Sequence, residues 1–331
     1  MIFHQLFDPE SSTYTYIVAD EETRDAVIID PVLGNERRDL AVLAADGLKL
    51  AWVLDTHVHA DHVTGANALK AATGATTAVG EACGTVGYDH ALVDGERIPF
   101  GGDSLTAIFT PGHTPGSTSF AWRDRVFTGD TLLIGGCGRT DFQDGNAHEL
   151  YRSITRKLFA LPDATLVFPA HDYKGRTHGS IGEEKATNPR VTGRSEAEFV
   201  ALMGSLGLAR PKRIDEAVPL NRMGGLVSEG DVPWRSLPAA QATEALSQPG
   251  VAIADLREAS RSKADPWPGA VLVAEKDYDR LAQMASGCDT LYLICGLGKK
   301  SMLAARELAA RGVPNVVNIA GGMRAIRAEQ D

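Results

Sequence analysis

Residues 56–62, THVHADH, place three histidines and an aspartate directly after the apolar run LAWVLD. A short apolar run of this kind predicts a buried strand. Metal-binding side chains at its end restrict the fold, because strand ends on one edge of a sheet converge in space. The motif therefore predicts a sheet whose strand ends surround one site.

Other strand-like runs end in residues of the same kind. His113 lies in TPGHTPGS, Asp130 in VFTGDT and His171 in FPAHDY. Imidazole and carboxylate groups are ligands for zinc, iron and manganese. One such histidine is as well explained as a hydrogen-bonded loop residue, but the whole set predicts a metal site.

The rest of the first two thirds of the chain predicts short strands and amphipathic helices. We expect strands over residues 2–7, 13–19 and 24–30, then in TTAVG, ERIPF, SLTAIFT, STSFAW, RVFTGD and TLVFPAH. We expect helices in GANALKAATG, YRSITRKLFAL and EAEFVALMGSLG.

The histidine pattern resembles the metallo-β-lactamase superfamily, which implies an αβ/βα sandwich with the metal at one edge of its sheets. In its two-metal members, one metal takes the positions of His57, His59 and His113. The second takes those of Asp61, His62 and His171, and Asp130 bridges. All seven positions are filled, so a binuclear thioester hydrolase of the glyoxalase II type stays open as an alternative.

Further blocks are similar to the persulfide dioxygenase (sulfur dioxygenase) family across residues 1–225. These blocks are GGCGRTDFQDGNAHELYRSI, FPAHDYKG, EEKATNPRVT and IDEAVPLNRMGG. The resemblance implies one Fe(II) per chain, held by His57, His113 and Asp130 as a facial triad with open positions. It implies oxidation of glutathione persulfide by O2 to sulfite, with release of glutathione.

The same resemblance assigns roles to the neighbouring residues. It implies that His59, Asp61, His62 and His171 orient ligands and water. Arg139 and Tyr173 match positions that contact glutathione, and Asp141 holds Arg139 or a metal ligand in place. A structural ion pair between Arg139 and Asp141, and a packing role for Tyr173, stay open.

Residues 226–236, in a stretch rich in glycine, proline and charge, are the predicted linker. Beyond it, residues 237–331 contain the short apolar runs VAIADLRE, AVLVAEK, TLYLIC and NVVNIAG, separated by helical stretches. This alternation is typical of a parallel α/β sheet. The sequence therefore predicts a second, C-terminal domain.

The stretch LYLICGLGKKS predicts a strand, a glycine-rich loop and a helix that begins near Lys299 and runs to about Arg311. Successive amides at Gly296 and Gly298, together with the helix N-terminus, can bind an anion. They would stabilise the thiolate of Cys295, a candidate nucleophile. The other interpretation is a buried, inert cysteine.

This domain resembles rhodaneses, which implies a doubly wound α/β fold and an active loop at CGLGKKS, including Lys299, Lys300 and Ser301. Rhodanese chemistry interconverts thiosulfate and glutathione with glutathione persulfide and sulfite. Lys300 stands where the family usually has arginine, and Ile326 replaces its closing tryptophan. A domain kept for docking or as a passive sulfur relay therefore stays open.

Both sites handle sulfane sulfur, so we hypothesise a fused persulfide dioxygenase and rhodanese. A scaffold that only binds glutathione is a further alternative.

The charge and the apolar pattern of the chain favour small molecules as its binding partners. The net charge of −10 with no basic run makes nucleic acid an unsuitable partner. The N-terminus MIFHQLFDPESS does not resemble a signal peptide, and no apolar run is long enough to span a membrane. Four cysteines without a dense pattern predict a reducing, cytoplasmic location. The sequence leaves the oligomeric state open, with a homodimer as one candidate.

Overall fold

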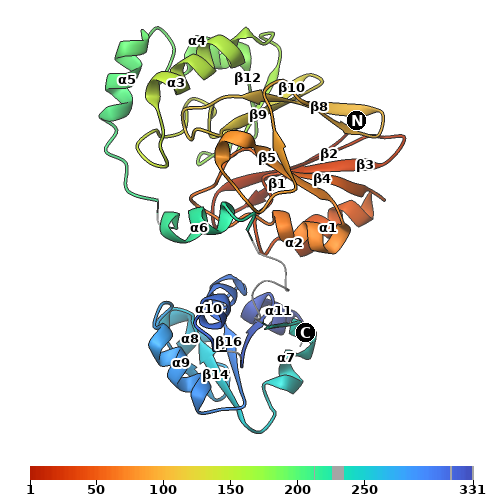
Figure 1. The fold of residues 1–331 in the computed structure, drawn as a ribbon, viewed down its shortest axis with the longest axis vertical. Helices are drawn as coiled ribbons and strands as arrows, with labels where there is room; N and C mark the ends of the chain where they lie inside the picture. Colours follow the sequence, from red (N-terminus) through yellow and green to blue (C-terminus); the bar gives the residue numbers. More distant parts are fainter. Residues whose placement is uncertain (212, 226–234, 314, 330–331) are drawn as a thin grey trace. The chain divides into compact units, whose positions relative to one another are not determined.

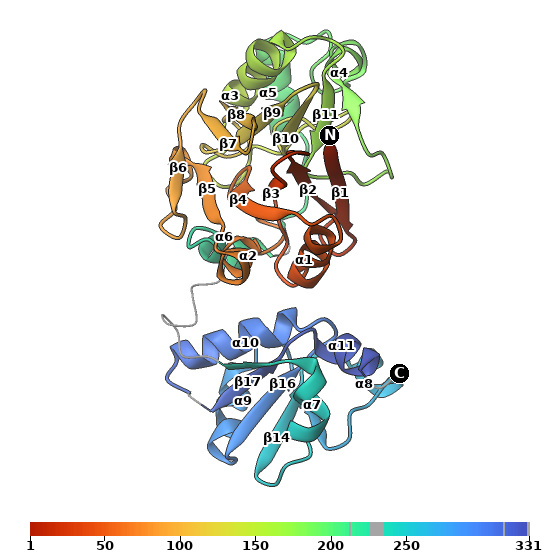
Figure 2. The same cartoon turned by 90° about the vertical axis from the view of Figure 1, so that its right-hand side faces the viewer.

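The computed structural model describes residues 1–211, 213–225, 235–313 and 315–329. The chain forms two compact units, Met1–Leu226 and Val227–Asp331 (Figures 1 and 2). The predicted linker lies mostly in residues 226–234, outside the described residues, so its bounds stay a prediction. In the part of the chain that the structure describes, no helix is long and apolar enough to cross a membrane.

Unit 1 contains two mixed six-stranded sheets that face each other. The first has the order β1 (Ile2–Asp8), β2 (Thr13–Ala19), β3 (Asp25–Ile29), β4 (Lys49–Asp55), β5 (Thr76–Gly80) and β6 (His90–Leu92). The second has the order β12 (Gly179–Ser180), β11 (Leu166–Pro169), β10 (Arg125–Gly129), β9 (Thr118–Trp122), β8 (Asp103–Phe109) and β7 (Arg97–Phe100).

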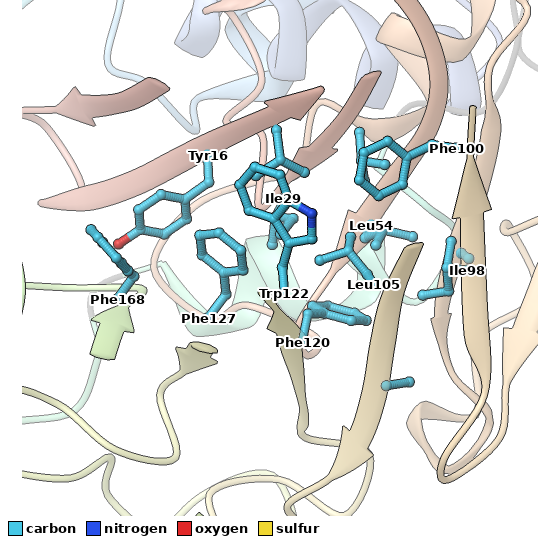
Figure 3. Close-up of a cluster of buried hydrophobic side chains, with 14 of the residues drawn as sticks. Tyr16, Ile29, Leu54, Ile98, Phe100, Leu105, Phe120, Trp122, Phe127 and Phe168 are labelled. Carbon is cyan, nitrogen blue, oxygen red and sulfur yellow. The ribbon is translucent and has the colours of Figure 1, made fainter. Parts of the chain in front are cut away.

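Strand β2 shows why this unit is a sandwich with helices outside. Every residue of TYTYIVA is buried. Because side chains alternate along a strand, Tyr16 and Val18 join the core between the sheets, while Ile17 and Ala19 join a second core on the outer face. Figure 3 shows the inner core, where aromatic rings from both sheets interlock.

Helices cover both outer faces (Figure 1). α1 (Glu36–Ala45) and α2 (Ala66–Thr73) pack on the first sheet. The second sheet is covered by α3 (Ala147–Arg152) with its π and 3-10 extensions η2 (Ser153–Lys157) and η3 (Leu158–Ala160), by α4 (Ile181–Thr187) and by α5 (Glu196–Gly204). A 3-10 turn, η1 (Glu81–Cys83), and α6 (Ile214–Asn221) complete the unit. The predicted αβ/βα sandwich is confirmed.

Unit 2 has a parallel sheet in the order β13 (Arg235–Leu237), β17 (Val316–Ile319), β16 (Thr290–Ile294), β14 (Val251–Asp255) and β15 (Ala270–Leu272). One face packs on α9 (Tyr278–Ser286) and α10 (Lys299–Ala310), the other on α7 (Ala239–Ala245) and α11 (Gly322–Ala328). A short helix, α8 (Ala259–Ala264), follows β14. The predicted doubly wound fold is confirmed.

Candidate functional site

Strand ends from both sheets of unit 1 deliver the predicted metal ligands. His57 follows β4 of the first sheet, Asp130 follows β10 of the second, and His171 follows β11. His113 lies in the turn between β8 and β9. The sandwich therefore brings together residues that are far apart in the sequence.

His57, His113 and Asp130 form a compact triad. Each offers a ligand atom, and these atoms lie within 4.8 Å of one another. Nε2 of His113 lies 3.6 Å from Oδ2 of Asp130. Both histidines are buried, and Oδ1 of Asp130 has no hydrogen-bond partner among the described residues.

The two histidines of the triad are held so that an unprotonated nitrogen faces the site. Nδ1 of His113 donates to the carbonyl of Arg139 at 2.7 Å. Thr56 gives its own hydroxyl proton to Asp30, so its oxygen accepts from Nδ1 of His57 at 2.9 Å. This outer hydrogen bonding orients each ring as metal ligands require.

Gly129 allows Asp130 to approach this arrangement. Its φ of +53° lies in the left-handed region, and a Cβ there would lie 2.7 Å from Oγ1 of Thr56. A larger residue would separate the Asp130 strand from the His57 strand.

The other predicted residues form a second group beside the triad. His59, Asp61 and His62 also place ligand atoms within 4.8 Å of one another. Nδ1 of His62 donates to Asp61 at 3.0 Å, and Nδ1 of His171 donates to the carbonyl of Ser12 at 3.1 Å. Nε2 of His171 lies 3.6 Å from Oδ1 of Asp130, so that carboxylate lies between the two groups.

His59 is held by two buried carboxylates. Its Nε2 donates to Asp30 at 3.1 Å and lies 3.7 Å from Asp55. Asp55 in turn accepts from Thr64 at 2.7 Å and from Tyr88 at 2.5 Å. Within the described chain, Nδ1 of His59 and Nε2 of His62 have no hydrogen-bond partner. His57 and His113 therefore donate outward and present bare nitrogens inward, which suits a cation. Burial lowers the pKa of His59, but Asp30 and Asp55 outweigh it and hold that pKa well above its usual value.

The electrostatics favour metal binding by His57 and Asp61 in particular. Burial and the neighbouring rings of His59 and His113 hold the pKa of His57 well below its usual value. Burial raises the pKa of Asp61, but His62 and His171 outweigh it and hold that pKa well below the usual range. A neutral imidazole and an ionised carboxylate are the forms that bind metals.

Arg139 and Tyr173, the predicted glutathione contacts, differ in their surroundings. The guanidinium of Arg139 holds both oxygens of Asp141, at 2.6 and 2.7 Å, and its Nη1 donates to the carbonyl of Ala209 at 2.6 Å. Tyr173 is 73% exposed, stacks on His171 and borders a surface pocket of about 480 Å³. The pocket is also lined by Gln5, Phe7, Ser12, Tyr14, Asp172, Gly175 and Thr177.

In unit 2, Cys295 follows β16 and lies at the start of the loop that leads into α10. Its buried sulfur accepts from the amide of Ser301 at 3.4 Å and from the Ser301 hydroxyl at 3.3 Å. The closing glycines, Gly321 and Gly322, lie against the Cys295 loop. The amide of Met323, the residue after them, donates to the Cys295 carbonyl at 2.8 Å. The sulfur of the candidate nucleophile therefore has two hydrogen-bond donors from Ser301.

The charged residues of this second site are partly engaged. Nζ of Lys300 lies 2.5 Å from Glu275, which raises the pKa of Lys300. The side chain of Lys299 is outside the described residues. Arg257 is buried and holds Asp255 through two nitrogens, so this pair belongs to the framework of the fold.

Sequence reasoning missed the residues that hold the ligands from behind. These are Asp30, Thr13, which donates to Asp61 at 3.1 Å, and Asn221, which contacts the backbone of the histidine loop. The one available signal was that Asp30 ends the apolar strand run DAVIID.

Comparisons with known proteins agree with the division of the chain into two units. Residues 8–171 match the metallo-β-lactamase superfamily, and residues 238–329 match the rhodanese-like domain. The mitochondrial persulfide dioxygenase ETHE1 of Homo sapiens is 44% identical over 228 residues, which cover 68% of this chain and 89% of that protein. The crystal structure of ETHE1 from Myxococcus xanthus is 54% identical and superposes with a TM-score of 0.67, covering 68% of this chain and all of that chain.

A metallo-β-lactamase structure from Staphylococcus aureus shares the fold over a longer span. It covers 97% of this chain and 98% of its own, with a TM-score of 0.67 and 24% identity.

Proposed function

Because this chain belongs to the persulfide dioxygenase family of the metallo-β-lactamase superfamily and carries a rhodanese-like domain, we propose that it oxidises glutathione persulfide and transfers sulfane sulfur. Residues 1–225 would convert glutathione persulfide, O2 and water into glutathione, sulfite and two protons. Residues 237–331 would exchange sulfur between thiosulfate, glutathione and sulfite. The observation that carries the proposal is the triad of His57, His113 and Asp130, whose two histidines are buried.

One Fe(II) per chain is the proposed cofactor, held by that triad. The donor set fits, because two bare imidazole nitrogens and the carboxylate of Asp130 converge there. One oxygen of that carboxylate has no hydrogen-bond partner among the described residues. When bound, ferrous iron supplies the redox chemistry that lets a persulfide react with O2. The proposed roles of His59, Asp61, His62 and His171 are to orient the triad, water and substrate.

The protein's own residues would place the substrate. Tyr173 and the pocket beside it offer an apolar wall and polar groups for the glutathione moiety. The backbone carbonyl of Arg139 accepts from His113, while the guanidinium of Arg139 is bound to Asp141. We therefore propose that Arg139 also acts by fixing that histidine. A glutathione carboxylate would have to share or displace Asp141.

The proposed sulfur transfer begins with attack of the Cys295 thiolate on a sulfane sulfur. The sulfur–sulfur bond of the donor breaks, the electron pair leaves with sulfite or glutathione, and Cys295 carries a persulfide. The amides of Gly296 and Gly298, the Ser301 hydroxyl and the positive charges of Lys299 and Lys300 would stabilise the anions on both sides of this step. The four cysteines are all free thiols, which supports the proposed cytoplasmic location.

A second candidate is a binuclear thioester hydrolase. The group His59, Asp61 and His62 favours it, because these residues form another potential metal site beside Asp130. Persulfide dioxygenase activity predicts one iron per chain, and the hydrolase predicts two zinc ions.

The test is oxygen uptake by anaerobically purified, metal-assayed protein given glutathione persulfide. We expect O2 consumption, sulfite formation and close to one iron per chain. Absence of uptake, with two zinc ions bound and hydrolysis of S-lactoylglutathione, would establish the hydrolase instead.

A further inference from the structure

The stretch LNRMGG, residues 220–225, is the end of unit 1 and packs against the loop that carries the histidine motif. Its Asn221 is 1% exposed and lies at the C-terminal end of α6. Asn221 Oδ1 accepts from the amide of Thr64 at 2.8 Å. Its Nδ2 donates to the carbonyls of His59 at 2.9 Å and His62 at 2.8 Å.

One side chain thus binds the histidine loop at three points. An asparagine amide has two donor hydrogens and one acceptor oxygen, and here all of these are used. The two carbonyls belong to residues whose rings face the metal site, so the loop backbone and its ligands are fixed together. Without the amide group, two buried carbonyls would lose their donor, which proteins rarely tolerate.

The LNRMGG stretch is itself fixed in place. The amide of Asn67 donates to the carbonyl of Gly224 at 3.3 Å, and Nδ2 of Asn67 donates to that of Met223 at 3.2 Å. Gly225 has a φ of +87°, and a Cβ there would lie 2.3 Å from the carbonyl oxygen of Thr64. Such close backbone contact requires glycine and leaves Asn221 little freedom.

We propose that Asn221 is a positioning residue for the metal centre. It acts through the backbone of the loop 57–64, which it holds in the shape that directs His57 toward His113 and Asp130. The inference rests on the proposed metal site, but not on which reaction that site performs.

The test measures metal affinity on the full chain, with Co²⁺ as the probe and its visible absorption as the readout. Removing an outer hydrogen bond from a metal site commonly weakens binding about 10- to 100-fold. We expect Asn221→Ala to lower Co²⁺ affinity by at least about tenfold and to change the absorption bands of the bound ion. The matched control is Asn67→Ala, which loosens the same stretch without touching the loop and should stay within about threefold of the wild type.

Asn221→Asp separates the two kinds of hydrogen bond. The aspartate keeps an acceptor for Thr64 but places a second oxygen against the carbonyls of His59 and His62. If these carbonyls carry the effect, the Asn221→Asp variant behaves like the alanine variant. Wild-type affinity in Asn221→Asp, or equal losses in Asn221→Ala and Asn67→Ala, would overturn the inference.

Hydrogen exchange on the wild-type chain tests the inference even if the variants do not fold. Co²⁺ should slow exchange in residues 57–64 and also in 218–225, because the two segments are coupled by Asn221. Protection confined to 57–64 would contradict the coupling. Failure of the wild type to bind Co²⁺ would instead contradict the proposed metal centre, so the two failures are distinct.

Discussion

Gly298 offers a sharp test of how the Cys295 loop is built. It precedes α10 with a φ of +81°, and a Cβ there would lie 2.5 Å from the amide nitrogen of Gly321. Gly312, at the other end of the same helix, has a φ of +80° and no atom within 4 Å of an added Cβ. The two glycines therefore differ in steric contact but not in backbone conformation.

Alanine at either position incurs the cost of a left-handed residue, about 1–2 kcal/mol. At Gly298 the collision with backbone adds about 1–3 kcal/mol, because the closing glycines must move. We therefore expect Gly312→Ala to destabilise unit 2 by about 1–2 kcal/mol and Gly298→Ala by about 2–5 kcal/mol. Only Gly298→Ala should also slow sulfur transfer, by at least about tenfold, since it displaces the amides around Cys295.

Pulse proteolysis in urea measures the stability of each unit through the sizes of the protected fragments. The rate of sulfur transfer from thiosulfate to cyanide reports on the geometry of the Cys295 loop. Equal losses of stability in both variants, or normal sulfur transfer in a folded Gly298→Ala protein, would refute this account of the loop.

The contacts described above support three further predictions. Burial raises the pKa of Asp39 from 3.8 to about 6, although Arg38 opposes it. The folded state therefore binds the proton more tightly, and this group removes stability as pH rises from about 4 to 6. Asp39→Asn should gain about 2 kcal/mol relative to wild type between about pH 4 and pH 7 in urea unfolding, and a constant difference would contradict the shift. Cys295→Ser should abolish sulfur transfer and leave O2 uptake within about twofold, because the two active sites are chemically independent; joint loss in a folded, iron-loaded protein would disprove that independence. Glu275→Gln frees Lys300, so the KM for thiosulfate should fall about two- to fivefold at low salt; an unchanged KM would show that Lys300 does not meet the anion.

The sequence was sufficient to predict much of the local structure and the convergence of His57, His113 and Asp130. Strand β2 and helix α10 follow from apolar runs and from a glycine-rich loop before a helix, which are local signals. Helix α1 was not predicted, because its ERRD start is charged and only Asp39 and Leu43 are buried.

The residues behind the ligands could not be predicted, because their contacts join distant parts of the chain. Asn221 meets His59 across 162 positions, and His171 meets Ser12 across 159. A polar residue in a loop looks the same in sequence whether it holds a ligand or faces water. For Arg139, the sequence left open a glutathione contact or an ion pair with Asp141, and the fold forms the ion pair.

The number of metal ions shows why residue types alone are insufficient. All seven candidate ligands have the right chemistry, and the structure orients every one of them. The two groups of ligands differ in the hydrogen bonds that their carboxylates accept. The carboxylate of Asp130 has Oδ2 at 3.6 Å from His113 and Oδ1 at 3.6 Å from His171, so it belongs to both groups. In the second group, Asp61 gives one oxygen to both His62 and Thr13. A metal bound through that oxygen would compete with these two donors, whereas Oδ1 of Asp130 has no hydrogen-bond partner in the described chain. We therefore propose that hydrogen bonding, as well as the set of residues, decides which site a cation fills first, with His57, His113 and Asp130 as the expected site.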